Sequence, residues 1–257
     1  MEWNADKYFE TCGRVTEHGM KLVDVLRQMP CEKVLDLGCG TGVLTHEISE
    51  FVQEVTGIDS SSAMIEKARS SYPGLQFQVM DACALTWEDT FDAVFSNAVF
   101  HFIKEQGILL DSIHKALKAD GALICEFGAM GNIAALLDAV ETACTKRGKN
   151  YLLRFYYPAA DEYRGLLEKH GFSVDSLVNH DLDTRLQEGE VSLRNWITQI
   201  FQIEMEWFDP AERTIILDEI ESALRPTHWD GAQWHLPNRR IQLIARKGGC
   251  AAENAKQ

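Results

Sequence analysis

Three glycines at alternate positions form the clearest chemical pattern in the sequence. They lie in residues 34–42, VLDLGCGTG, directly after a short apolar run. Because glycine lacks a Cβ, such a loop lets a ligand approach the backbone closely. A dinucleotide loop has the spacing G-x-G-x-x-G, whereas the spacing here is G-x-G-x-G with Asp36 two positions before the first glycine. A carboxylate there would repel a phosphate and attract an ammonium, which favours an amino-acid-like ligand over NAD.

Further polar groups stand where predicted strands end. Asp59 ends the second strand, where one carboxylate can accept both hydroxyls of a ribose. Asp81 follows the third strand, placed for an adenine amino group, and the backbone N–H of Ala82 is available for a ring nitrogen. The fourth strand leads into Asn97 and Ala98. Since open α/β folds bind ligands at the carboxyl ends of their strands, we expect one crevice lined by all these groups.

Short apolar runs that alternate with helical patterns supply the elements that position these residues. The pattern predicts strands over 33–37, 54–59, 75–80, 91–96, 122–127, 172–178 and 240–246. Alternation of the first five with helices is typical of a parallel sheet with right-handed crossovers. The predicted fold is therefore α/β, a doubly wound, seven-stranded, Rossmann-like sheet with helices on both faces.

The chain outside this sheet is expected to form a lid, a cap and a tail. Residues 1–30 carry a weak helical period and predict an N-terminal helical lid. The main domain is expected over 31–247, with a helical cap inserted at about 182–235, because the helical stretch 192–206 is too apolar to stand alone. Residues 248–257 have no apolar pattern and predict a disordered tail.

Composition and charge exclude several classes of protein. The 257 residues include 39 acidic and 25 basic side chains, a net charge of −14, which argues against a nucleic-acid partner. No apolar run is long enough to cross a membrane and no signal peptide is recognisable, so we expect a cytoplasmic protein without a membrane partner. The seven cysteines and eight histidines are dispersed, and no metal site is expected.

Taken in order, these motifs resemble those of the class I S-adenosylmethionine-dependent methyltransferases. The similarity covers about residues 30–130 and includes the loop that begins at Asp36, then Asp59, Asp81-Ala82 and the run FDAV at 91–94. Weaker features, such as LPNRR at 236–240, resemble the trans-aconitate methyltransferase-like branch. The resemblance implies S-adenosyl-L-methionine as the cofactor. Its implied and candidate binding residues are Asp36, Gly38, Gly40, Thr41, Gly42, Asp59, Ser60, Met64, Asp81, Ala82, Asn97 and Ala98.

Within that set, the resemblance implies a division of labour. Asp36 and the backbone of residues 38–42 would hold the methionine part, Asp59 the ribose, and Asp81 with Ala82 the adenine. Asn97 and Ala98 would lie beneath the sulfonium. Thr41 has an alternative role as a cap of the following helix.

Methyl transfer from a sulfonium asks the protein mainly for position and orientation. A carboxylate acceptor needs no base, whereas an amine or a phenol must lose a proton. The candidate bases are His101, just past the fourth strand, and Glu126 on the fifth. The alternatives are that His101 packs between two phenylalanines and that Glu126 makes a structural hydrogen bond.

Acceptor recognition is expected from aromatic residues and an arginine outside the core. Arg240 offers planar recognition of a carboxylate, and only one of the adjacent pair Arg239 and Arg240 can face a pocket. Trp3 and Tyr8 either fold over the cofactor or pack with an N-terminal helix, and Trp196 either faces the acceptor or belongs to the cap core. The substrate candidates are Trp3, Tyr8, Tyr156, Tyr157, Trp196 and Arg240.

The sequence thus predicts a methyltransferase that acts on an oxygen or nitrogen of a small molecule, with a carboxylic acid as the preferred acceptor. A nicotinamide-dependent oxidoreductase and a non-catalytic cofactor-binding protein remain the alternatives. The oligomeric state and the identity of the acceptor are not predicted.

Overall fold

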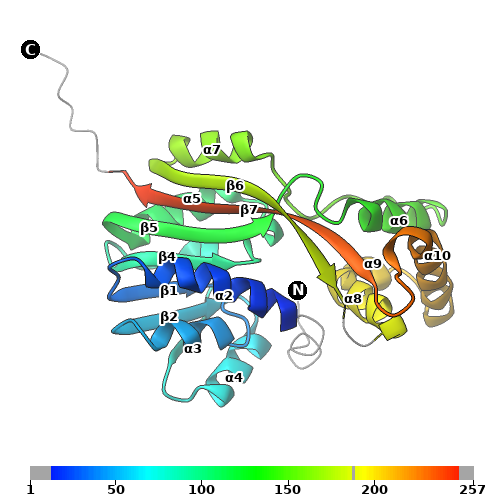
Figure 1. Cartoon of the computed structure of the whole chain (residues 1–257), viewed down its shortest axis with the longest axis horizontal. Helices are drawn as coiled ribbons and strands as arrows, with labels where there is room; N and C mark the ends of the chain where they lie inside the picture. Colours follow the sequence, from blue (N-terminus) through cyan, green and yellow to red (C-terminus); the bar gives the residue numbers. More distant parts are fainter. Residues whose placement is uncertain (1–12, 187–188, 249–257) are drawn as a thin grey trace, which may run out of the picture.

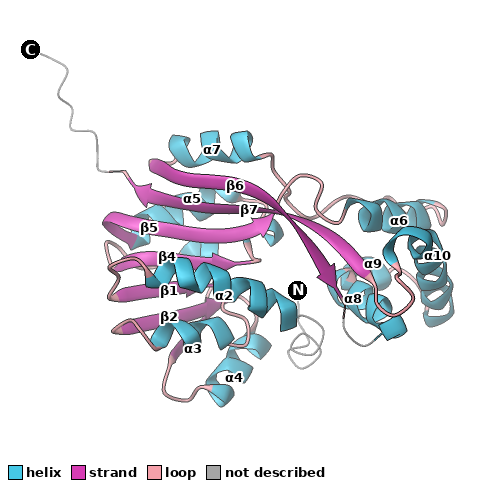
Figure 2. Cartoon of the chain, viewed as in Figure 1, coloured by secondary structure: helices cyan, strands magenta, loops and turns pink. Residues whose placement is uncertain are grey.

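The computed structural model describes residues 13–186 and 189–248, which contain one seven-stranded sheet in the order β3-β2-β1-β4-β5-β7-β6 (Figures 1 and 2). The strands are β1 (Lys33–Leu37), β2 (Glu54–Asp59), β3 (Gln76–Val79), β4 (Phe91–Asn97), β5 (Leu117–Gly128), β6 (Phe172–Arg185) and β7 (His235–Lys247). The α-helices are α2 (Gly13–Arg27), α3 (Val43–Ser49), α4 (Ser62–Ser71), α5 (Gln106–Ala116), α6 (Ala134–Thr145), α7 (Ala160–Lys169), α8 (Ser192–Ile200), α9 (Gln202–Met205) and α10 (Pro210–His228). Short 3₁₀ turns are η1 (Ala82–Ala84), η2 (Phe100–Phe102) and η3 (Gly189–Val191).

Helices cover both faces of the sheet, which confirms the predicted doubly wound architecture. Apolar side chains of α2 and α3, such as Leu22 and Ile48, pack on one face against Phe95 of β4. On the other face, Leu109 of α5 and Tyr163 of α7 join a second buried cluster. Each face therefore buries the apolar stripe of its own helices.

The sheet is mixed rather than parallel throughout. Strands β1 to β5 are parallel, as predicted, but β7 runs antiparallel to both β5 and β6. The reversal follows from the connection, because the chain between β6 and β7 stays beyond the carboxyl edge of the sheet and re-enters from that same edge (Figure 1).

Strands β6 and β7 are much longer than the segments predicted for them. They remain paired from Phe172 with Lys247 to Arg185 with His235, so their distal halves form a two-stranded arm beyond the sheet (Figure 2). The predictions for 172–178 and 240–246 ended where the apolar residues end. On the arm, β6 alternates between exposed and half-buried positions, a pattern too polar for the apolar rule to detect.

The arm carries a helical unit with its own hydrophobic core, called the cap here and made of α6, α8, α9, α10 and the segment 146–159. Its buried cluster includes Val140 of α6, Ile197 of α8 and Ile220 of α10, together with Phe201 between α8 and α9. The insertion expected at about 182–235 contains α8 to α10. The structure adds α6 to this unit, because α6 packs against α10 although some 70 residues separate them in the chain.

The predicted tail beyond residue 248 and the first part of the predicted lid, residues 1–12, lie outside the described residues. Within residues 13–186 and 189–248, no helix combines the length and hydropathy that a membrane crossing requires.

Candidate active site

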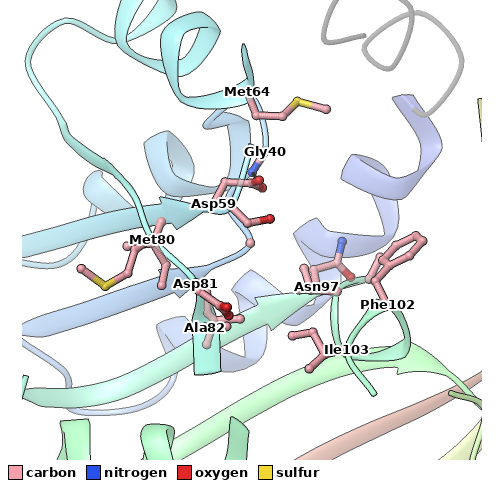
Figure 3. A pocket seen from close by; sticks show the side chains of 15 residues that line it. Gly40, Asp59, Met64, Met80, Asp81, Ala82, Asn97, Phe102 and Ile103 are labelled. Carbon is pink, nitrogen blue, oxygen red and sulfur yellow. Dashed lines mark hydrogen bonds between the residues drawn. The ribbon is translucent and has the colours of Figure 1, made fainter. Parts of the chain in front are cut away.

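A cavity of about 260 Å³ opens at the carboxyl ends of the first four strands of the chain (Figure 3). This volume lies near the lower end of the range of small-molecule sites, roughly 300–1,000 Å³. Nine of the twelve cofactor candidates line it, because parallel strands bring their carboxyl ends to one edge. They are Gly38, Gly40, Asp59, Ser60, Met64, Asp81, Ala82, Asn97 and Ala98.

The three loop positions are occupied by glycine for different physical reasons. All three adopt positive φ values, which favour glycine. A Cβ on Gly38 would come within 2.2 Å of Val99 Cγ2, and one on Gly42 within 2.7 Å of the Phe77 ring. A Cβ on Gly40 would meet no described atom within 4 Å, so this residue presents bare backbone to the cavity.

The Asp59 carboxylate is fixed against this loop. Its Oδ2 accepts a hydrogen bond from the Gly40 N–H at 3.1 Å, and its Oδ1 accepts one from the Ser61 N–H at 2.8 Å. Burial raises the pKa of Asp59, and the two backbone donors oppose that shift. A carboxylate oxygen can accept more than one hydrogen bond, so Asp59 keeps acceptor capacity on its cavity side.

Asp81 combines a structural and a cavity-lining position. Its Oδ1 accepts a hydrogen bond from the Cys83 N–H at 2.8 Å and caps η1, while the side chain stays exposed at the cavity wall. Ala82, the first residue of η1, lines the same wall. The predicted pair Asp81 and Ala82 therefore faces the cavity together (Figure 3).

Three cofactor candidates do not line the cavity. Asp36 is only 2% exposed, and its Oδ2 accepts a hydrogen bond from Thr45 Oγ1 at 2.6 Å, behind the loop. Burial raises the pKa of Asp36 to about 7, with the Asp59 charge adding to the shift and Thr45 opposing it. Thr41 is buried, and Gly42, not Thr41, is the N-cap of α3, where no side chain caps the helix. Asp36 thus supports the loop from within the fold.

The charges around the cavity carry one sign. Its lining includes the carboxylates of Asp59 and Asp81 and no lysine or arginine among the residues that the structure describes there. The rest is mostly apolar, with Met80, Val99 and Ile103 among the walls. Such a cavity suits an uncharged nucleoside with hydroxyl and amino donors, and it disfavours a diphosphate.

A second group of polar residues lies beside the cavity, on the sheet face that α2 covers. In the register, Asn97 pairs with Glu126 and Glu126 with Gln242. Two residues further along these strands, Gly128 pairs with Arg240 and Arg240 with His180. Paired residues present their side chains on the same face of a sheet. The face therefore gathers Glu126 and Arg240 with two residues that the sequence interpretation missed, His180 and Gln242.

Glu126 is 4% exposed and is held by its neighbours across the strands. Its Oε2 accepts a hydrogen bond from Gln242 Nε2 at 3.3 Å and lies 3.1 Å from His180 Nε2. The signal for His180 was absent from the sequence because this residue lies on the arm, beyond the apolar run that predicted its strand.

His101 is buried in the middle of η2 and held as a neutral imidazole. Burial lowers its pKa well below the usual range, and the charge of Arg240 acts in the same direction. The Gly128 N–H donates to His101 Nδ1 at 3.3 Å, which assigns the proton to Nε2. The ring is thus arranged as a hydrogen-bond donor at Nε2, and its Nδ1 is not open for a base role.

Tyr156 and Tyr157 contact different groups of residues. The Tyr157 ring lies 5.7 Å from the His101 ring, and its hydroxyl shares a hydrogen bond with Asn132. Burial raises the pKa of Tyr157 to about 12, although Arg240 opposes that shift. The Tyr156 hydroxyl donates instead to Glu162 Oε1 at 3.1 Å, on the α7 side. Only Tyr157 joins the group beside the cavity.

The other substrate candidates are distributed over the molecule. Arg239 is exposed, with its Nε 3.5 Å from Asp181 Oδ1, while Arg240 is half-buried and near enough to His101 to influence it electrostatically. Trp196 packs on the cap core, its ring 6.4 Å from that of Phe201. Trp3 and Tyr8 lie outside the described residues.

Comparisons with known proteins show similarity to methyltransferases. Residues 35–125 match the model of the family described as Methyltransferase domain. The chain is 30% identical to uncharacterized methyltransferase C70.08c of Schizosaccharomyces pombe over 260 residues, which cover 95% of this chain and 98% of that protein. It is 32% identical over 126 residues to trans-aconitate 2-methyltransferase of Deinococcus radiodurans, a match that covers 48% of either chain.

Among solved structures, the chain is similar in fold to phosphoethanolamine N-methyltransferase 2 of Haemonchus contortus, determined in complex with S-adenosyl-L-methionine. The TM-score is 0.57 and the identity 19%, over 91% of this chain and 53% of that one.

Proposed function

The chain belongs to the class I S-adenosylmethionine-dependent methyltransferases, and we propose that it methylates an oxygen or nitrogen of a small molecule that carries a carboxylate. The observation that carries the second part is the group of Arg240, His101 and Tyr157 around Gly128, beside the cofactor cavity.

The residues of the cavity fit the cofactor. Asp59 would accept the ribose hydroxyls, Asp81 the adenine amino group, and the open backbone at Gly40 would leave room for the methionine part. When bound, the cofactor supplies a methyl group activated on a sulfonium. The two carboxylates and the absence of basic side chains in the described lining also argue against the nicotinamide alternative, whose diphosphate requires donors or positive charge.

The proposed recognition of the methyl acceptor depends on hydrogen-bond donors to its carboxylate. A guanidinium binds a carboxylate through two parallel N–H bonds, and Arg240 stands out in a chain with a net charge of −14. The Nε2–H of His101 and the hydroxyl of Tyr157 are further donors near it. These groups would orient the acid and exclude water, which is what an in-line displacement requires.

Oxygen of the carboxylate is the favoured acceptor atom. A carboxylate is already ionised at neutral pH, so no proton has to be removed, and the neutral His101 with its engaged Nδ1 is suited to donate rather than to accept a proton. An amine acceptor would call on Glu126, the buried carboxylate of the same sheet face.

The experiment is a screen of small acids with isotopically labelled S-adenosylmethionine, scored by product mass and repeated on two matched variants. Arg240→Gln should raise the KM of the acid about 10- to 100-fold, the scale of a charged hydrogen bond, while the Kd of S-adenosylhomocysteine stays unchanged. Arg239→Gln, the exposed neighbour, should leave both constants unchanged. Equal kinetics of wild type and Arg240→Gln would exclude the acid as recognised here, and calorimetry that detects NADH but not S-adenosylhomocysteine would exclude the cofactor.

A further inference from the structure

Two buried oxygen atoms in the cap have no hydrogen-bond partner among the described residues. They are the hydroxyl of Tyr151, a residue 8% exposed, and Oε2 of Glu204, a residue 2% exposed. More than nine in ten buried polar groups in folded proteins are paired, and an unpaired one destabilises the fold. Two such atoms in one hydrophobic core therefore require an explanation.

The other carboxylate oxygen of Glu204 is paired. Its Oε1 accepts a hydrogen bond from Arg154 Nε at 2.7 Å, and Arg154 also donates to the Ile200 carbonyl. The Arg154 guanidinium lies over the Phe155 ring, 4.7 Å from its centroid. The guanidinium thus compensates the charge of the carboxylate but engages only one of its oxygens.

Tyr151 lies close to this carboxylate without bonding to it. It shares a buried cluster with Phe155, Ile200 and Met205, the residues next to Arg154 and Glu204 or bonded to Arg154. Burial raises the pKa of Tyr151, and the charge of Glu204 adds to that shift. Both oxygens are acceptors, and the phenol can in addition donate. A group that donates hydrogen bonds to both would complete the pair.

The pair also lies next to the acceptor group described above. The Phe155 ring, over which the Arg154 guanidinium lies, stacks on the Tyr157 ring with their centroids 5.7 Å apart. An aromatic contact leads from the cap to the cofactor cavity, because the Phe155 ring lies edge-on to Phe102, 5.6 Å away, and Phe102 lines the cavity.

We propose that Tyr151 and Glu204 form a subsite for a hydrogen-bond donor, an ammonium or hydroxyl group, at the end of the acceptor opposite its carboxylate. The inference rests on the proposed function, since Arg240 would hold the carboxylate end. The substrate class is then an acid with a distal amine or hydroxyl, its apolar body lying along the aromatic rings of Phe102, Phe155 and Tyr157. A terminal ammonium or hydroxyl has about the size of the water molecule that would otherwise bridge the two oxygens.

The first test uses stability. Tyr151→Phe should raise the Tm of the free protein, because it removes a buried hydroxyl that has no partner. Tyr163→Phe is the matched control: Tyr163 is fully buried, and its hydroxyl donates to Gln106 Oε1 at 2.8 Å, so its loss should lower the Tm. A Tm of Tyr151→Phe as low as that of Tyr163→Phe would mean that the hydroxyl is already paired, and the subsite would be overturned.

The second test uses binding to the complex with S-adenosylhomocysteine, measured by calorimetry. The probes are two matched pairs, 3-(4-hydroxyphenyl)propanoate with 3-phenylpropanoate and 5-aminopentanoate with pentanoate. At least one donor-bearing member should bind wild type about tenfold more tightly than its parent acid, and Tyr151→Phe should reduce that preference to about threefold or less.

The outcomes separate the two proposals. If parent acids bind and neither donor-bearing partner binds more tightly, the two oxygens hold water only, so the subsite falls while the carboxylate acceptor stands. A preference for the donor that persists in Tyr151→Phe likewise overturns the subsite. If S-adenosylhomocysteine binds and none of the four acids does, the carboxylate acceptor falls and takes the subsite with it.

Discussion

The cofactor cavity and the cap differ in how completely their polar groups are hydrogen-bonded. At the cavity, Asp59 and Asp81 each accept hydrogen bonds from backbone N–H groups and still face the space they line. In the cap, Glu204 is paired through one oxygen only, and Tyr151 has a hydroxyl without a described partner. The cavity is thus complete before its ligand arrives. The cap keeps two buried oxygens without a described hydrogen-bond partner, as the proposed donor subsite requires.

The two regions also differ in how far apart their partners lie in the chain. Asp59 reaches Ser61, two residues away, and Gly40, nineteen residues away. In contrast, fifty residues separate Arg154 from Glu204, and Glu126 is 116 residues from Gln242. Neighbouring strand–turn–helix units build the cofactor side, whereas the cap and its sheet face assemble from remote segments. Three comparisons between variants test this contrast.

The largest effect is expected from Phe201→Ala in the cap. Phe201 is fully buried among cap residues, and its loss should lower the free energy of unfolding by about 3–5 kcal/mol. If the cap is a separate layer, hydrogen exchange should accelerate in α8 to α10 while the Kd of S-adenosylhomocysteine stays within about twofold. Phe95 is equally buried, beneath α2. Phe95→Ala should both lower the free energy of unfolding and raise the Kd of S-adenosylhomocysteine. Equal loss of cofactor affinity in both variants would show that the regions are one unit.

A smaller effect is expected within the glycine loop. Gly38→Ala combines a left-handed backbone, roughly 1–2 kcal/mol, with a clash against Val99, roughly 1–3 kcal/mol, so it should lower the free energy of unfolding by about 2–5 kcal/mol. Gly40→Ala has only the backbone cost, because its Cβ enters open space. Urea unfolding of both proteins measures the difference. Gly40→Ala should nevertheless weaken cofactor binding, since its methyl group enters the cavity. Two equally unstable variants would contradict the distinction between the two positions.

The smallest effect concerns pH. Burial raises the pKa of Asp36 from 3.8 to about 7, so the protonated form favours folding below pH 4 and that stability is lost as the pH rises through 7. Between pH 5 and pH 7, wild type should lose about 2 kcal/mol relative to Asp36→Asn, measured by urea unfolding at each pH. Parallel pH profiles of the two proteins would place Asp36 in contact with water or with a cation, against its position behind the loop.

Sequence predicted the features that depend on nearby residues and missed those that depend on remote ones. Strands β1 to β4, the loop and the carboxylates at their ends were predicted because each signal lies within a dozen residues. The burial of Asp36 away from the cavity lining was not foreseen, because its partner Thr45 is set by how α3 packs on the sheet. His180, Gln242, Tyr151 and Glu204 carried no signal, because nothing in their local sequence distinguishes them from ordinary surface or core residues.

By itself, the sequence determined the α/β core, the glycine loop with its acidic companions and therefore the cofactor class. Local apolar periodicity and backbone freedom depend on neighbours in the chain. The tertiary structure alone decided the direction of β7, the membership of α6 in the cap and the gathering of Arg240, His101 and Tyr157 around Gly128. Those features depend on which distant segments share a face, and pairing across 50 to 120 residues is settled by the burial of whole surfaces, not by any short stretch of sequence.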